Sequence, residues 1–145
     1  MDKKQLAQDA IALVAPAIEN LFNTGKRNLC HIVVMNPEYM PWEKDFDDAI
    51  LLEYSFGNPS EWELDFVGMA KAKALQSWRH RVPNAQLQHT HPASLREDDL
   101  KFYGSYVYGD IVVSCSGLEQ HFDVLISSWV AHAMEQLAIH DRETS

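Results

Sequence analysis

Apolar residues recur at helical spacing in three parts of the chain. The first covers residues 6–22, where leucine, isoleucine, valine and alanine side chains form one stripe. Similar stripes cover about residues 61–80 and 119–140. Pro16 lies inside the first stripe, and because an interior proline costs about 3 kcal/mol, we expect that helix to be kinked or split in two. The pattern therefore predicts three main helices.

Four shorter runs have the apolar or alternating pattern of strands. They cover residues 29–35, 49–56, 102–108 and 111–115, and Gly109-Asp110 between the last two is typical of a hairpin turn. The order of elements is helix, strand, strand, helix, short helix or coil, strand, strand, helix. We therefore expect one α+β domain over residues 1–145, with an antiparallel sheet of about four to five strands and helices packed on it.

Three segments match the capping box, in which a serine accepts a hydrogen bond from an early helix N–H and a glutamate reaches back. They are Ser60-x-x-Glu63, Ser94-x-x-Glu97 and Ser116-x-x-Glu119. The first and third precede long helical patterns, and the middle one opens a brief segment at residues 95–100. The boxes predict where these helices begin.

Helical spacing also predicts which faces are buried. In the helix of residues 61–80, one face carries aromatic and small side chains: Trp62, Phe66, Ala70, Ala74, Ser77 and Trp78. In the last helix Asp123 falls near the edge of the apolar face, and Ser127, Ala131 and Glu135 lie opposite it.

Composition and charge narrow the class of protein. The 145 residues are 46% hydrophobic, which is enough for one packed core and excludes disordered and low-complexity classes. Twelve basic and 21 acidic residues give a net charge of −9, which argues against nucleic-acid or anionic-membrane partners. No signal-peptide core or spanning segment is visible, so we expect a soluble cytoplasmic protein. Cys30 and Cys115 are expected to be buried free thiols, with one disulfide as the alternative.

The densest candidate for chemistry is Ser114-Cys115-Ser116-Gly117, at a strand–helix junction. Free N–H groups at a helix N-terminus favour an anion, the Ser116 hydroxyl can donate, and Gly117 allows close approach to the backbone. Capping and turn formation alone also explain both residues. A nucleophilic Cys115 is disfavoured, because a phosphatase-type loop needs arginine where His121 stands and a nucleophile elbow needs glycine in place of Ser114.

His89-x-His91 is the only close histidine pair. If the segment is extended, both rings point to one side and could bind a metal, with His31 or His121 as a third ligand. The alternatives are solvated loop histidines or a single axial haem ligand.

Basic residues cluster in the second half of the helix of residues 61–80 and just after it, at Lys71, Lys73, Arg79, His80 and Arg81. This cluster is either a solvated face that suits the helix C-terminus or an edge that recognises carboxylates or phosphates. Arg79 and Arg81 are the candidates for the second role.

The run from Val112 to Asp123, with the helix that follows, resembles the end of the GlcG/HbpS-like family. These small proteins are often labelled haem-binding or haem-degrading, and the same domain is appended to some cobalamin adenosyltransferases. Members end in a strand, a Val-Ser-Gly turn and a helix with an acidic residue six positions after the glycine, a spacing that Gly117 and Asp123 keep. The chain departs from the family where Tyr106-Val107-Tyr108 replaces a glycine-rich strand and Ser-Cys replaces Gly-Val before Ser116. The resemblance implies a profilin-like α+β fold, a pocket near Ser116–Gly117 and assembly into oligomers.

The leading hypothesis is a non-catalytic domain that binds or senses a small molecule, either haem or another carboxylate-bearing ligand, in a homo-oligomer. The candidate ligand-binding residues are Ser116, Gly117, Glu119, Asp123, Arg79 and Arg81, and the candidate metal ligands are His89 and His91. One alternative is a homo-oligomeric assembly or adaptor protein. The other is a small enzyme that uses Cys115 or a metal at His89 and His91.

Overall fold

Four antiparallel strands form one sheet at the centre of the protein. The computed structural model describes all residues from Met1 to Ser145. The strands are β1 (Cys30–Met35), β2 (Ile50–Phe56), β3 (Ser105–Tyr108) and β4 (Ile111–Ser116), in the order β2-β1-β4-β3. Every pairing is antiparallel. The predicted α+β class is confirmed, with four strands in the sheet.

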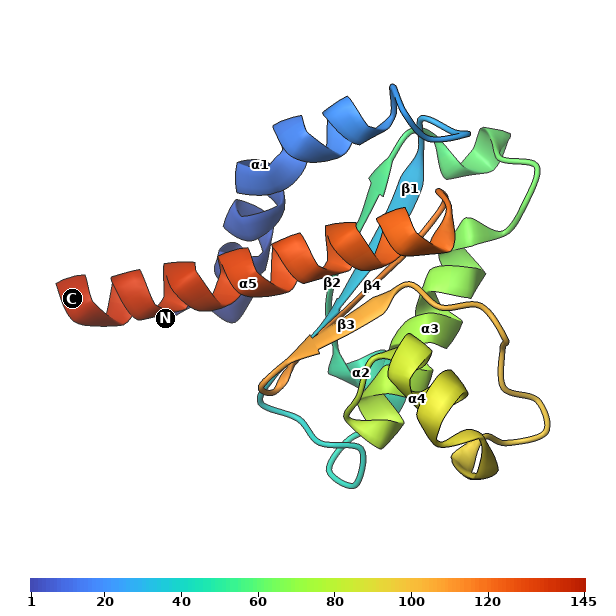
Figure 1. The fold of residues 1–145 in the computed structure, drawn as a ribbon. Coiled ribbons are helices and arrows are strands. Elements are labelled where there is room, and N and C mark those ends of the chain that lie inside the picture. The colour runs from blue at the N-terminus through green and yellow to red at the C-terminus, as the bar shows by residue number, and fades with distance from the viewer.

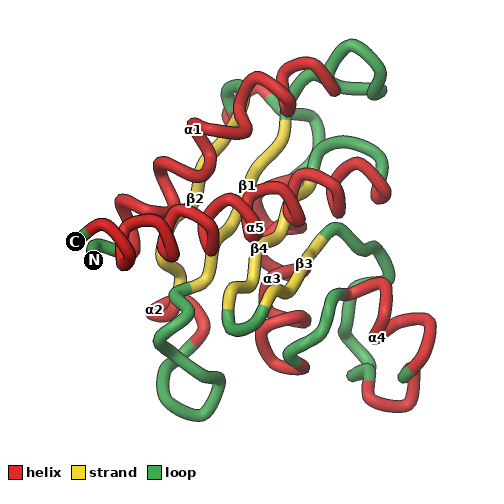
Figure 2. The backbone as a smooth tube through the Cα atoms, turned by 60° about the vertical axis from the view of Figure 1, so that its left-hand side comes forward, coloured by secondary structure: helices red, strands yellow, loops and turns green.

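Helices cover both faces of the sheet (Figure 1). Helices α1 (Lys3–Leu21) and α5 (Gln120–Thr144) pack on one face and on each other. Helix α3 (Phe66–His80) packs on the other face, against β1 and β4. The side chains of β1 alternate between two cores: Ile32 and Val34 face α1 and α5, and Val33 and Met35 face α3. The N-terminus lies beside the last turns of α5, on the same side of the molecule as the C-terminus (Figure 1 and Figure 2).

Helix α1 runs without a break from Lys3 to Leu21 and contains Pro16. Its N-terminus is capped by the Asp2 carboxylate, which accepts a hydrogen bond from the Gln5 N–H at 3.2 Å. The expected alternative of two separate helices is therefore wrong. Packing of α1 against the sheet and α5 compensates for the backbone hydrogen bond that the proline lacks.

All three predicted capping boxes are wrong. Ser60 lies in a single 3-10 turn (Pro59–Glu61), and α3 begins at Phe66, where the Asp65 carboxylate accepts the Gly68 N–H at 2.9 Å. Residues 95–100 contain no helix. Ser116 is the last residue of β4, and Glu119 takes the N-cap position of α5 without a side-chain capping bond. The Ser-x-x-Glu pattern also occurs in ordinary turns, so the pattern alone does not fix where a helix begins. The observed helix starts depend on tertiary packing.

Two short helices complete the chain. Helix α2 (Phe46–Ala49) leads directly into β2, and α4 (Asn84–Thr90) follows α3 after two residues that precede its N-cap, Pro83. Helix α4 was not predicted from the sequence, and it replaces the extended segment considered at His89-x-His91. Helix α4 is held by the buried Asn84, whose Nδ2 donates to the Lys73 carbonyl at 3.0 Å.

The observed buried faces differ from the expected ones in both long helices. On α3 the buried set includes Lys73, which the basic-face interpretation placed in solvent or at an anion-binding edge. On α5 it includes Asp123, Ser127 and Ala131, because α5 contacts both the strands and α1 and so buries a wide arc. Cys30 and Cys115 are buried and free, as expected. None of the helices has the combination of length and apolar character that a membrane crossing needs.

Candidate functional site

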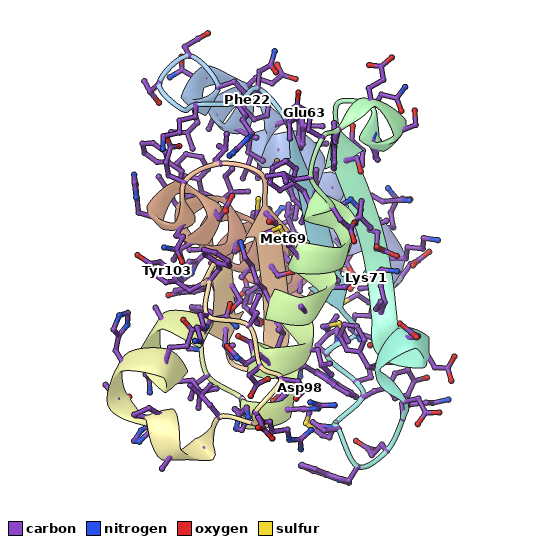
Figure 3. All side chains as sticks on the ribbon, turned by 90° about the vertical axis from the view of Figure 1, so that its right-hand side faces the viewer. Phe22, Glu63, Met69, Lys71, Asp98 and Tyr103 are labelled. Carbon is purple, nitrogen blue, oxygen red and sulfur yellow. The ribbon has the colours of Figure 1, made fainter.

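A cavity of about 490 Å³ opens between the first half of α3 and the first turn of α5. The loop before β1 and the segment before β3 close its other sides. Five apolar side chains form its wall, namely Leu64, Phe66, Met69, Phe102 and Leu118. Polar groups line the rest, including Lys26, Arg27, Lys73, Tyr103, Ser116, Glu119, His121 and Asp123. Figure 3 shows two residues of the cavity lining, Met69 on α3 and Tyr103 on the segment that leads into β3.

A buried ion pair lies at the inner end of the cavity. Lys73 from α3 and Asp123 from α5 approach to 3.3 Å between Nζ and Oδ2, and each side chain is only 2% exposed. The Lys73 ammonium also donates to the Cys115 carbonyl at 3.1 Å. An ammonium has three N–H donors, so one remains free for a group that enters the cavity.

The Asp123 carboxylate also fixes the turn between β4 and α5. Its Oδ1 accepts the Leu118 N–H at 3.1 Å and the Cys115 thiol at 3.6 Å. The six-residue spacing between Gly117 and Asp123 therefore has a structural reason: the carboxylate reaches back one helical turn to hold the turn that the glycine forms. The same contacts place the Lys73–Asp123 pair beside Ser116.

Burial raises the pKa of two acidic groups at this point, the Asp123 carboxyl and the Cys115 thiol. Desolvation raises the pKa of Asp123 from 3.8 to about 6, and the positive charge of Lys73 opposes part of that rise. Desolvation and the neighbouring Cys30 raise the pKa of the Cys115 thiol well above its ordinary value. A thiol held protonated is a poor nucleophile, which agrees with the expectation that Cys115 is inert.

The raised pKa of Asp123 predicts a pH dependence of stability. Between about pH 4 and pH 6 the folded protein binds more protons at this site than the unfolded chain, so the free energy of unfolding contributed by Asp123 falls as the pH rises. We expect Asp123→Asn to remove this pH-dependent contribution, so that the free energy of unfolding varies less with pH between pH 4 and pH 6. Urea unfolding of both proteins at several pH values measures it, and parallel profiles would contradict the assignment.

Cationic groups and a hydroxyl stand free at the cavity. The Arg27 guanidinium lies 5.0 Å from the centre of the Phe66 ring and donates one N–H to the Gly117 carbonyl at 3.2 Å. The remaining N–H groups of Arg27 have no hydrogen-bond partner in the protein. The same is true of the exposed Lys26 ammonium and of the Ser116 hydroxyl. Ser116 is only 2% exposed, so its hydroxyl is available chiefly from within the cavity. Neither Lys26 nor Arg27 was selected from the sequence.

Gly117 does not line the cavity, and its role is steric. A Cβ at this position would lie 2.5 Å from the Leu29 carbonyl oxygen and 2.7 Å from Cys30 Cα, and its φ is 146°. The glycine therefore lets the end of β4 pass close to β1. This differs from the expected role of admitting a ligand to the backbone.

The other predicted residues lie away from the cavity. Arg79 is exposed and Arg81 pairs with Asp110 at 3.4 Å, both at the C-terminal end of α3, whereas the cavity lies beside its first half. The Arg79–Arg81 edge and the Ser116–Gly117 turn are thus separate places. His89 and His91 are exposed at the end of α4, where the His89 ring bonds the Ala85 carbonyl at 2.7 Å. No three histidine, cysteine or acidic side chains are grouped so that they could hold a metal ion.

Comparisons with known proteins give no match. No protein-family model matches the chain, and neither a curated protein nor a solved structure is similar to it at a significant level. The resemblance to the GlcG/HbpS-like family therefore stays a prediction.

Proposed function

We propose that the protein binds a small carboxylate-bearing molecule in the cavity between α3 and α5, without catalysing a reaction. The observation that carries the proposal is the buried Lys73–Asp123 pair at the inner end of a cavity that Arg27, Lys26 and Ser116 also line. A buried ion pair is weak evidence for stability as such, because desolvation cancels much of the attraction. Its position in a cavity with unpartnered donors supports a role in recognition.

The charges around the cavity favour an anionic group. Three cationic side chains line it, against Glu119 and an Asp123 carboxyl whose pKa is about 6. The Arg27 guanidinium is well suited to a carboxylate, since its planar donors match two oxygens at once. The apolar wall formed by Phe66, Met69 and Phe102 would receive the hydrophobic body of the ligand.

Haem is one molecule of this class, because it carries two carboxylates on a large apolar ring. His121, Tyr103 and Met69 line the cavity and are of residue types that ligate haem iron. The raised pKa of Cys115 and the lack of a metal-binding group near His89 and His91 give no support to the enzymatic alternatives. The expected homo-oligomer stays a prediction, as does the absence of nucleic-acid and membrane partners.

Binding can be tested by a thermal-shift screen of small carboxylic acids, with haemin added separately and followed by its Soret band. A ligand that binds only the folded protein raises its stability by about 2.7 kcal/mol at a hundredfold excess over the dissociation constant. We expect Arg27→Gln to weaken binding of a hit about tenfold or more, because a charge-assisted hydrogen bond contributes about 1.5–3 kcal/mol.

Arg79→Gln is the matched control, since Arg79 is exposed on α3 outside the cavity. It should leave the affinity unchanged. Equal weakening by both substitutions would mean that general charge, and not the cavity, governs binding. No saturable hit from the screen would overturn the proposed function.

A further inference from the structure

The Glu119 carboxylate lines the cavity without accepting any hydrogen bond from the protein, and it is the unpartnered acceptor among several unpartnered donors. It lines the cavity at the N-cap of α5; its Oε2 is buried beside Gly25 with no hydrogen-bond partner, and its Oε1 accepts no hydrogen bond either. The Glu119 side chain takes part in no ion pair and caps no helix N–H. Buried polar atoms without partners are rare in folded proteins, so this carboxylate calls for a donor from outside the chain, such as water or a ligand.

Glu119 lies among cations that it does not pair with. Lys26 and Arg27 line the same cavity, yet neither comes within ion-pair distance of the Glu119 carboxylate. The Arg27 guanidinium is instead held over the Phe66 ring and against the Gly117 carbonyl. The cavity thus presents separate positive and negative groups beside one apolar wall.

From this arrangement we infer that the ligand is zwitterionic: an amino-acid-like molecule with a carboxylate, a protonated amine and an apolar side group. This inference rests on the proposed function and narrows its ligand class. The carboxylate binds Arg27 and the free Ser116 hydroxyl, and the ammonium donates to Glu119. Rotation about the terminal bond of Glu119 exchanges its two oxygens, so the carboxylate can present either one to the cavity.

A cavity of about 490 Å³ is large enough for an amino acid and falls within the usual range for small-molecule sites of about 300–1,000 Å³. Leu64, Phe66 and Phe102 provide a surface for an aliphatic or aromatic side group. A plain carboxylic acid would leave Glu119 without a donor, and it would add a second anion beside that carboxylate. The site therefore discriminates by the amine as well as by the carboxylate.

Titration calorimetry with matched probes tests the inference. Phenylalanine is compared with 3-phenylpropionate, which lacks the amine, and with 2-phenylethylamine, which lacks the carboxylate. Leucine and 4-methylpentanoate form a second pair on an aliphatic framework. We expect each amino acid to bind at least about tenfold more tightly than its analogue without the amine, since one charged hydrogen bond is at stake.

Glu119→Gln should reduce this preference for the amine to about threefold or less. Glu143→Gln, an exposed position near the end of the same helix, should keep it. If the carboxylic acids bind as tightly as the amino acids, the zwitterion inference is overturned and the proposed function stands. If the preference survives Glu119→Gln, Glu119 does not receive the amine and the inference also fails. If no probe of either framework binds, the zwitterion inference fails, and the screen of carboxylic acids and haemin decides the proposed function.

Discussion

Lys73→Met is expected to lower the free energy of unfolding by about 3–5 kcal/mol, because the buried Asp123 carboxyl loses its counter-ion and must either stay charged in a dry site or take up a proton. The methionine retains most of the volume and the apolar stem of lysine, so the loss reflects the charge and its hydrogen bonds to Asp123 and to the Cys115 carbonyl. Asp123 would still accept the Leu118 N–H, and the fold around the turn should persist. Equilibrium unfolding in urea at pH 7 gives the value.

Two comparisons make this expectation specific. Lys71→Met removes a half-exposed lysine on the same helix, 3.7 Å from Glu53, and should cost less than about 1 kcal/mol. The double variant Lys73→Met/Asp123→Asn should recover part of the loss, with a coupling energy of about 0.5–3 kcal/mol. Equal costs at Lys71 and Lys73 would show that Lys73 is not a buried, paired charge.

Gly117→Ala is the second substitution with a large expected effect, about 3 kcal/mol of destabilisation. A Cβ would meet backbone atoms at 2.5 Å and 2.7 Å, which cannot move aside as a flexible side chain can. Overpacking of this kind costs about 1–3 kcal/mol, and the φ of 146° adds strain of about 1–3 kcal/mol.

Gly109→Ala separates the two causes. Gly109 also has a positive φ, of 59°, but nothing lies within 4 Å of its would-be Cβ. Only backbone strain applies there, so we expect a cost of about 1–2 kcal/mol. Both can be measured by thermal or urea unfolding. If the alanine variants at the two glycines are equally stable, the close approach of Gly117 to β1 plays no part.

The order of the main helices and strands could be predicted from the sequence, because burial of apolar stripes dictates it. The position of Asp123 in the site could be predicted only through a resemblance, and its partner Lys73 was missed. The signal for Lys73 was present: it lies three residues after Ala70 and four before Ser77, inside the face of small side chains. A lysine at such a position is buried only with a counter-charge, and Asp123 was the candidate on the last helix.

The cavity itself could not be predicted, for a physical reason. Arg27 precedes β1, Tyr103 precedes β3 and Ser116 ends β4; the long-range pairing of β1 with β4 brings Arg27 to the other two, and α3 and α5 complete the cavity. Local patterns also misplaced the helix starts, since Asp65 and not Ser60 caps α3. Side chains that close a turn or cap a helix depend on neighbours that a local pattern does not contain.

Helix α5 separates the cavity from both chain ends. Its first turn lines the cavity, and its 25 residues, at about 1.5 Å each, extend roughly 37 Å to the C-terminus, with the N-terminus beside its last turns. Either chain end can therefore carry an affinity tag, a fluorescent label or a fused protein on the side of the molecule away from the cavity. The protein can be immobilised on a sensor surface through one terminus with the mouth of the cavity directed into solution.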